Sequence, residues 1–183
     1  MNTTNLEKLD KTFHFPITRA IPEPRKEVPL YKRLLKFGMY RRKFEIMEDY
    51  ILWIPWEASY LFIPKGFIFD GASVPKILNG LYSPTGVLLG GAGPHDFGYR
   101  YKALLFVNVI TGDLYIDNRT KAELDNTFQS LCERESGMVI ASGAATLMLS
   151  ICGFIGWRQN KKTRIDIQKD FPHLIIEDIN ETI

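Results

Sequence analysis

The feature that most constrains the fold is a set of three short segments between residues 41 and 70. They are rich in aromatic and β-branched side chains. The segments read RRKFEIM, DYILWIPW and SYLFIPKGFIFD, and turn-prone or charged residues separate them. Such segments favour β-strands, and their close spacing favours an antiparallel meander. Pro55 and Pro64 are expected at strand ends or edges, because proline donates no hydrogen bond to a sheet.

Helical and turn patterns follow the strands. Ser73 is expected to cap a short helical turn that has Pro75 in its first turn. PHDFGYRYKALLF, residues 94–106, predicts a helix that begins at or near Pro94, because proline is favoured at the first helical position. FVNVITGDLYIDN predicts a hairpin that turns at residues 111–112.

A second long helix is predicted from RTKAELDNTFQSLCERES, residues 119–136. Its Leu124, Phe128 and Leu131 recur at the three-to-four spacing of one helical face. Together these patterns predict the α+β class, with a small antiparallel β meander packed against two or three helices. An irregular N-terminal arm and a C-terminal tail are expected to flank this core.

One α+β domain is expected over residues 41–160, because 183 residues fit a single core. Residues 1–40 predict an irregular, proline-rich arm, and residues 1–43 carry eleven Lys or Arg against four Asp or Glu. Residues 161–183 predict an acidic tail that lies at the periphery. The formal net charge of +2 gives no strong signal for nucleic-acid binding, so the expected partners are other proteins or further copies of this chain.

Residues 137–157, GMVIASGAATLMLSICGFIGW, contain no charged side chain in 21 positions. This length fits a membrane span, and a basic cluster follows it. The alternative is a helix buried in protein, and the many small residues favour that alternative because they suit close packing.

The cysteines and the N-terminus bear on the compartment. Cys132 and Cys152 belong to no Cys/His cluster, so a structural zinc site is not expected. The first residues contain no apolar run of signal-peptide length. A reducing cytoplasm is therefore the expected compartment.

His95 and Asp96 form the most chemically suggestive pair in the chain. In one interpretation they have a purely structural role at the start of a helix, where Asp96 pairs with Arg100 and His95 stacks on Tyr99. In the other, His95 is a general base because its ordinary pKa lies near neutrality, and Asp96 binds a metal or orients a partner group. Consecutive helical residues diverge by about 100°, so the two side chains are expected to divide these roles.

The segment HDFGYRYKA resembles the active-site helix of secreted phospholipases A2. The likeness implies a histidine base and a calcium-binding aspartate. It covers these nine residues alone. The cysteines that flank that family's motif are absent, and so is its calcium-binding glycine loop at the expected distance.

The segment FIFDGASVPK contains a second group of candidate functional residues. Asp70 after a strand is typical of a turn in which the carboxylate binds backbone amides two residues on. Ser73 is a candidate nucleophile, although the sequence lacks the G-x-S-x-G pattern of a nucleophile elbow.

These motifs together resemble a family that is common in bacteriophage genomes and prophages, catalogued as domain of unknown function 1353. The resemblance covers about residues 44–157 and implies a phage origin and a packed closing helix at residues 137–157, but no reaction. Leu124 departs from the pattern, which is expected to have a small residue before the helical aspartate. The matching residues are Phe67, Asp70, Gly71, Ala72, Ser73, Pro75, Pro84, His95, Asp96, Tyr99, Asp125 and Phe128.

The first functional hypothesis is a bacteriophage-encoded accessory protein without enzymatic activity. It would be a virion or assembly component of the tail, baseplate or neck, found in the host cytoplasm and then in the virion. The arm and the tail would contact other phage proteins or further copies of the chain. Under this hypothesis a buried polar network specifies the fold. Its members would be Asp70, Ser73, His95, Asp96 and Asp125.

The second hypothesis is a small hydrolase in which His95 is the base and Tyr99 supports it. Asp70, Asp96 and Asp125 would orient the histidine or bind a divalent cation such as Mg²⁺, Mn²⁺ or Ca²⁺, and no other cofactor is expected. The third hypothesis is a membrane-active lysis protein that uses residues 137–157, although membrane partners are disfavoured.

Overall fold

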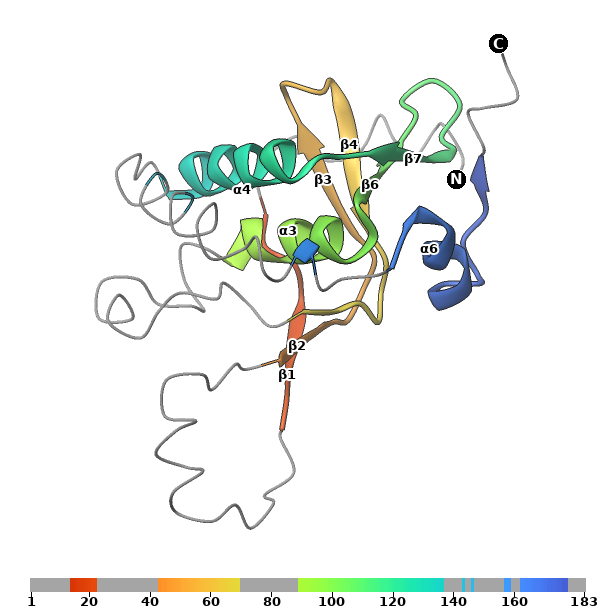
Figure 1. Cartoon of the computed structure of the whole chain (residues 1–183), viewed down its shortest axis with the longest axis horizontal. Helices are drawn as coiled ribbons and strands as arrows, with labels where there is room; N and C mark the ends of the chain where they lie inside the picture. The colour runs from red at the N-terminus through yellow and green to blue at the C-terminus, as the bar shows by residue number, and fades with distance from the viewer. Residues whose placement is uncertain are drawn as a thin grey trace.

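A computed structural model describes residues 14–22, 43–69, 89–136, 143, 146, 157–158 and 162–177 of the 183-residue chain. Over these residues the chain forms two β-sheets and three helices (Figure 1), which confirms the predicted α+β class.

The larger sheet has five strands in the order β3-β4-β6-β7-β8. Neighbouring strands in it run antiparallel, except that β8 runs parallel to β7. The smaller sheet has three antiparallel strands in the order β1-β2-β5. The bounds are β1 (Thr18–Ile21), β2 (Lys43–Ile46), β3 (Tyr50–Ile54), β4 (Ser59–Ile63), β5 (Ile68–Phe69), β6 (Ala103–Val107), β7 (Leu114–Asn118) and β8 (Ile176–Glu177).

The strands predicted from residues 41–70 are present, and they divide between the two sheets. β3 and β4 form a hairpin in the larger sheet, whereas β2 and β5 pair in the smaller sheet. Pro55 and Pro64 directly follow β3 and β4, which confirms their predicted places at strand ends. The buried faces of both sheets supply much of the hydrophobic core.

The helix predicted to begin at or near Pro94 begins five residues earlier, as α3 (Leu89–Tyr101). Pro94 therefore lies inside the helix. Residues 90–94 are all buried. Their packing against the rest of the protein outweighs the unfavourable propensity of proline for a helix interior. The C-terminal part of the prediction was also wrong, because residues 103–107 form β6, whose side chains are all buried. A completely apolar strand shows no alternation by which to distinguish it from a helix.

The predicted hairpin is confirmed by the antiparallel pairing of β6 with β7. Gly112 adopts a positive φ of 80° in the connection, and Oδ1 of Asn108 accepts the backbone N–H of Ile110. The amphipathic helix is confirmed as α4 (Lys121–Ser136), and its three predicted apolar residues are buried.

The described part of the predicted tail contributes to the core. α6 (Arg164–Asp170) begins with a capping box in which Thr163 and Asp166 bond each other's backbone. Ile167, Phe171 and Leu174 are buried in the main hydrophobic cluster, and β8 then joins the larger sheet. These residues pack against their own domain instead of extending from it.

Several predictions lie outside the described residues. They concern most of the arm, the helical turn at Ser73, nearly all of residues 137–157 and the last six residues of the tail. The described part of the arm, residues 14–22, contains β1, which is the edge strand of the smaller sheet.

Candidate functional site

α3 and α4 pack against each other (Figure 1), and two glycines on α3 lie at the contact. A Cβ atom on Gly98 would lie 2.2 Å from Cδ2 of Leu124, and one on Gly91 would lie 2.9 Å from Sγ of Cys132. The glycines are seven residues apart, so they share one face of α3. His95 lies between them on that face, and the close approach brings it to α4.

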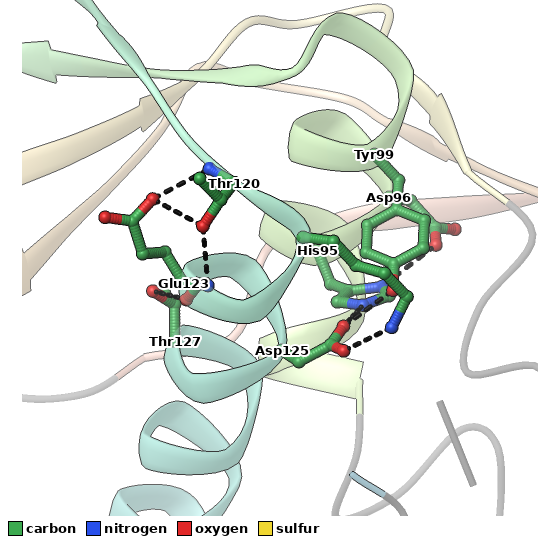
Figure 2. A network of polar contacts seen from close by, with 8 residues as sticks. His95, Asp96, Tyr99, Thr120, Glu123, Asp125 and Thr127 are labelled. Carbon is green, nitrogen blue, oxygen red and sulfur yellow. Dashed lines mark hydrogen bonds and ion pairs between the residues drawn. The ribbon is translucent and has the colours of Figure 1, made fainter. Parts of the chain in front are cut away.

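The N-terminus of α4 is fixed by a reciprocal cap, which Figure 2 shows. The backbone N–H of Thr120 donates to Oε2 of Glu123 at 2.7 Å, and the N–H of Glu123 donates to Oγ1 of Thr120 at 3.3 Å. This capping box satisfies backbone donors that a helix start leaves without partners. It therefore sets the position of Asp125, two residues further along the helix.

Asp125 is the centre of a polar network that joins the two helices (Figure 2). Its Oδ1 accepts a hydrogen bond from the hydroxyl of Tyr99 at 2.6 Å and lies 3.2 Å from Nε2 of His95. Its Oδ2 accepts a hydrogen bond from Nζ of Lys121 at 2.6 Å. The side chains of His95 and Asp125 are each 5% exposed, so only a small part of this pair meets bulk water.

The electrostatics of the network fix which nitrogen of His95 carries the proton. Burial raises the pKa of Asp125, but the hydrogen bonds from His95, Lys121 and Tyr99 outweigh burial and lower it to about 2. Asp125 is therefore ionised at neutral pH and accepts hydrogen bonds without donating any. Nε2 of His95 must then be protonated, which leaves Nδ1 as the basic nitrogen of the neutral ring.

The basic nitrogen of His95 faces a second carboxylate. Oδ1 of Asp96 lies 3.7 Å from Nδ1, and the side chain of Asp96 is 21% exposed. Burial lowers the pKa of His95, but the contacts with Asp125 and Asp96 outweigh burial and raise it above its ordinary value. The predicted divergence of the two neighbours is therefore partial, because Asp96 reaches both solvent and Nδ1.

Aromatic rings enclose His95. Its ring centroid lies 4.1 Å from that of Tyr99 and 5.2 Å from that of Phe128, and the ring centroid of Trp157 lies 5.3 Å from that of Tyr99. The predicted stacking of His95 on Tyr99 is present. Arg100, predicted to pair with Asp96, instead donates to the carbonyl oxygen of Ile68. Apolar walls lower the local dielectric and strengthen the polar contacts within them.

The structure brings together four of the residues predicted from the sequence: His95, Asp96, Tyr99 and Asp125. Asp70 and Ser73 lie outside the described residues. Lys121 was not predicted as a site residue, although its place four residues before Asp125 on a helix is the signal of an ion pair.

Metal binding bears on the predicted roles of the carboxylates. Both oxygens of Asp125 accept hydrogen bonds, and the ammonium group of Lys121 lies at Oδ2, where a cation would compete with it. Across the described ranges, no group of three or more His, Cys, Asp or Glu side chains is arranged to hold a metal ion. This geometry favours Asp125 as the group that orients His95.

Fold and site together define an α+β protein with a buried histidine–aspartate pair between two closely packed helices. The model of one family, described as a protein of unknown function (DUF1353), matches residues 44–142, which is more than half of the 183 residues. The chain belongs to this family, as its motifs predicted. No curated protein and no solved structure matches the chain.

A helix that spans a membrane is long and predominantly apolar. Within the part of the chain that the structure describes, every helix is too short or too polar to span a bilayer. The segment proposed for the lysis hypothesis, residues 137–157, lies almost entirely outside that part.

Proposed function

We propose that this protein is a hydrolase in which His95 acts as a general base toward water. The observation that carries the proposal is the contact between Nε2 and Asp125, which leaves Nδ1 as the basic nitrogen beside Asp96. A base oriented by a buried carboxylate is a recurrent arrangement in enzymes that activate water or a hydroxyl group. Titratable groups with shifted pKa values also gather at functional sites more often than elsewhere.

The proposed reaction begins when Nδ1 of His95 takes a proton from water. The resulting hydroxide attacks the electrophilic carbon or phosphorus of an ester, and the imidazolium then returns the proton to the leaving oxygen. Asp125 stabilises the imidazolium that forms between these steps. Asp96, which lies at Nδ1, is more exposed than Asp125, which lies at Nε2. We propose that Asp96 binds the attacking water or a divalent cation. Asp70 remains a proposed ligand of the same cation.

The proposal predicts that His95→Gln lowers hydrolysis at least about 100-fold, because a general base contributes roughly 10²–10⁴ in rate. The full chain is assayed with p-nitrophenyl acetate, bis-p-nitrophenyl phosphate and phosphatidylcholine vesicles, with and without Mg²⁺, Mn²⁺ or Ca²⁺. His173→Gln is the matched control, because His173 is exposed and lies outside the network.

The pH dependence gives the same experiment a second readout. His95 acts as a base in its neutral form and its pKa is raised, so activity should rise with pH through a midpoint above about 6.5. Absence of hydrolysis of every probe by the wild-type chain contradicts the proposal. So does activity that His95→Gln leaves unchanged.

A second proposed function is that of a structural component of a bacteriophage particle. The observation that favours it is a set of apolar side chains at one end of the larger sheet, where β3 and β6 end and β7 and β8 begin. They are exposed by 45 to 88%, and exposed apolar groups that gather in one region often mark a protein interface. The residues are Trp56, Val109, Ile110 and Ile175.

This second proposal predicts that the protein is part of purified phage particles. Mass spectrometry of particles from the phage that encodes the chain should detect it at a fixed ratio to the major structural proteins. Absence of the protein from the particles removes a structural role in the virion. Residues 162–177 pack into the core, so less of the tail is available to contact neighbouring proteins. We therefore rank this function second.

A further inference from the structure

Lys121 lies on α4, the helix that also carries Asp125, and the two side chains are in contact. It lies one helical turn before Asp125 on α4, and its side chain is 17% exposed. Nζ donates to Oδ2, whereas the hydroxyl of Tyr99 and Nε2 of His95 meet Oδ1. The two oxygens of one carboxylate thus have separate partners on separate helices.

This division of partners determines the orientation of the carboxylate plane. The terminal torsion of an aspartate is broad and roughly two-fold, so contacts to one oxygen leave the plane free to turn. A second contact, from Lys121 to Oδ2, closes off that rotation. Lys121 also supplies a positive charge to a buried carboxylate, and a charge without a partner there would be strongly unfavourable.

We propose that Lys121 is a positioning residue, which holds the carboxylate of Asp125 so that Nε2 of His95 carries the proton and Nδ1 is free to act as the base. This inference rests on the proposed function for its catalytic meaning. Its structural content concerns the tautomer of His95, which is measurable without any substrate. Lys121 acts through Asp125, so it is not itself a catalytic residue.

The test is the ¹⁵N chemical shifts of His95 in the full chain, measured in the wild-type protein and in Lys121→Met at a pH where His95 is neutral. We expect the Nε2-protonated form to dominate in the wild type. In Lys121→Met the ratio of the Nε2-protonated to the Nδ1-protonated form should fall by about tenfold, because a carboxylate that is free to turn makes a weaker charge-assisted bond to the N–H at Nε2. Lys121→Arg should retain the wild-type ratio, because the guanidinium keeps a charged donor at Oδ2.

Lys169→Met is the matched control. Lys169 also pairs with an aspartate on its own helix, but it is 71% exposed and lies on α6. This variant should leave the tautomer ratio of His95 unchanged. If Lys121→Met does not fold, Lys121→Gln replaces it, because its shorter, neutral side chain brings no charged donor to Oδ2. A folded Met or Gln variant with the wild-type ratio overturns the proposal, and so does an Arg variant that loses that ratio.

The result separates this inference from the proposed function. A changed tautomer ratio in a protein that hydrolyses no probe supports the positioning role and contradicts the hydrolase. Where hydrolysis is present, Lys121→Met should lower kcat by about tenfold and leave KM unchanged, since Lys121 orients the base without binding substrate. Hydrolysis with an unchanged tautomer ratio contradicts the positioning role alone.

Discussion

Asp125→Asn is expected to lower the free energy of unfolding by about 3 kcal/mol at pH 6, because it removes the negative charge at the centre of a buried network. The amide has nearly the shape of the carboxylate but offers a single acceptor oxygen. His95, Tyr99 and Lys121 would then compete for that oxygen, and the ammonium group of Lys121 would lose the carboxylate charge that it faces at Oδ2. Urea denaturation followed by circular dichroism measures the difference.

The pH dependence of this difference follows from the two shifted groups. The lowered pKa of Asp125 adds stability that is present above its unfolded value of about 4 and is lost as pH falls through about 2. The raised pKa of His95 adds stability that is present below about 6.5 and is lost as pH rises through its folded value. The difference between wild type and Asp125→Asn should therefore be largest between about pH 4 and 6.5.

Asp113→Asn is the matched control for Asp125→Asn. It removes one carboxylate charge from the hairpin between β6 and β7. The side chain of Asp113 forms no hydrogen bond or ion pair in the described ranges, so the free energy of unfolding should change by less than about 0.5 kcal/mol. Equal effects of the two substitutions would show that the network adds nothing specific to stability.

Local patterns were sufficient to predict the strands within residues 41–70 and the helix α4. Strand-forming segments around Phe44, Leu52 and Leu61 carry their signal in their own side chains, and α4 carries a clear apolar face. Which strands pair is a different matter, because pairing depends on contacts between segments far apart in the chain. β8 joins the sheet from residues 176–177, and two residues carry no periodic signal.

The tail illustrates the same limit. Residues 162–177 are polar enough to indicate a peripheral segment, yet Phe171 and Leu174 are buried against α3 and its neighbours. Phe171 lies 6.4 Å from Tyr101, ring centroid to ring centroid, and the hydroxyl of Tyr101 donates to Asp170 at 2.7 Å. A few apolar residues were sufficient to anchor this charged segment to the core. The average composition of the segment does not reveal them.

The sequence predicted four residues of the candidate site, but it did not predict their geometry. The motifs identified His95, Asp96, Tyr99 and Asp125, because residues with reactive side chains at a helical spacing can be recognised in the sequence. The role of Lys121 depends on which oxygen of Asp125 each partner meets, and no sequence pattern encodes that. The role of Gly91 and Gly98 in the contact between the helices could not be predicted either, because it depends on which face of α3 meets α4.

Gly98→Ala is expected to lower the free energy of unfolding by about 2 kcal/mol, because the added methyl group overpacks the contact between α3 and α4. Its Cβ would lie 2.2 Å from Cδ2 and 3.0 Å from Cδ1 of Leu124, so more than one atom of the leucine would have to move. Leu124 is 1% exposed and has little space into which to turn. Thermal or urea denaturation measures the loss.

Gly93→Ala is the control for this substitution, on the same helix and with the same added atom. Its Cβ would meet Ile46 at 3.9 Å, an ordinary contact, so the cost expected at this position comes from placing a Cβ before Pro94 in a helix, and the variant should lose less stability than Gly98→Ala. Equal effects at the two glycines would contradict the packing explanation.

The double variant Gly98→Ala with Leu124→Ala relates this contact to the family pattern. Leu124 stands where the pattern is expected to have a small residue, and Gly98 supplies the space that the larger side chain needs. Leu124→Ala alone should cost about 3 kcal/mol through the cavity it leaves. The methyl group added at position 98 would fill part of that cavity, so the double variant should be more stable than the sum of the single effects by at least about 1 kcal/mol. Additive effects would mean that the two residues do not share one volume, and the spacing that holds His95 against Asp125 would then need another cause.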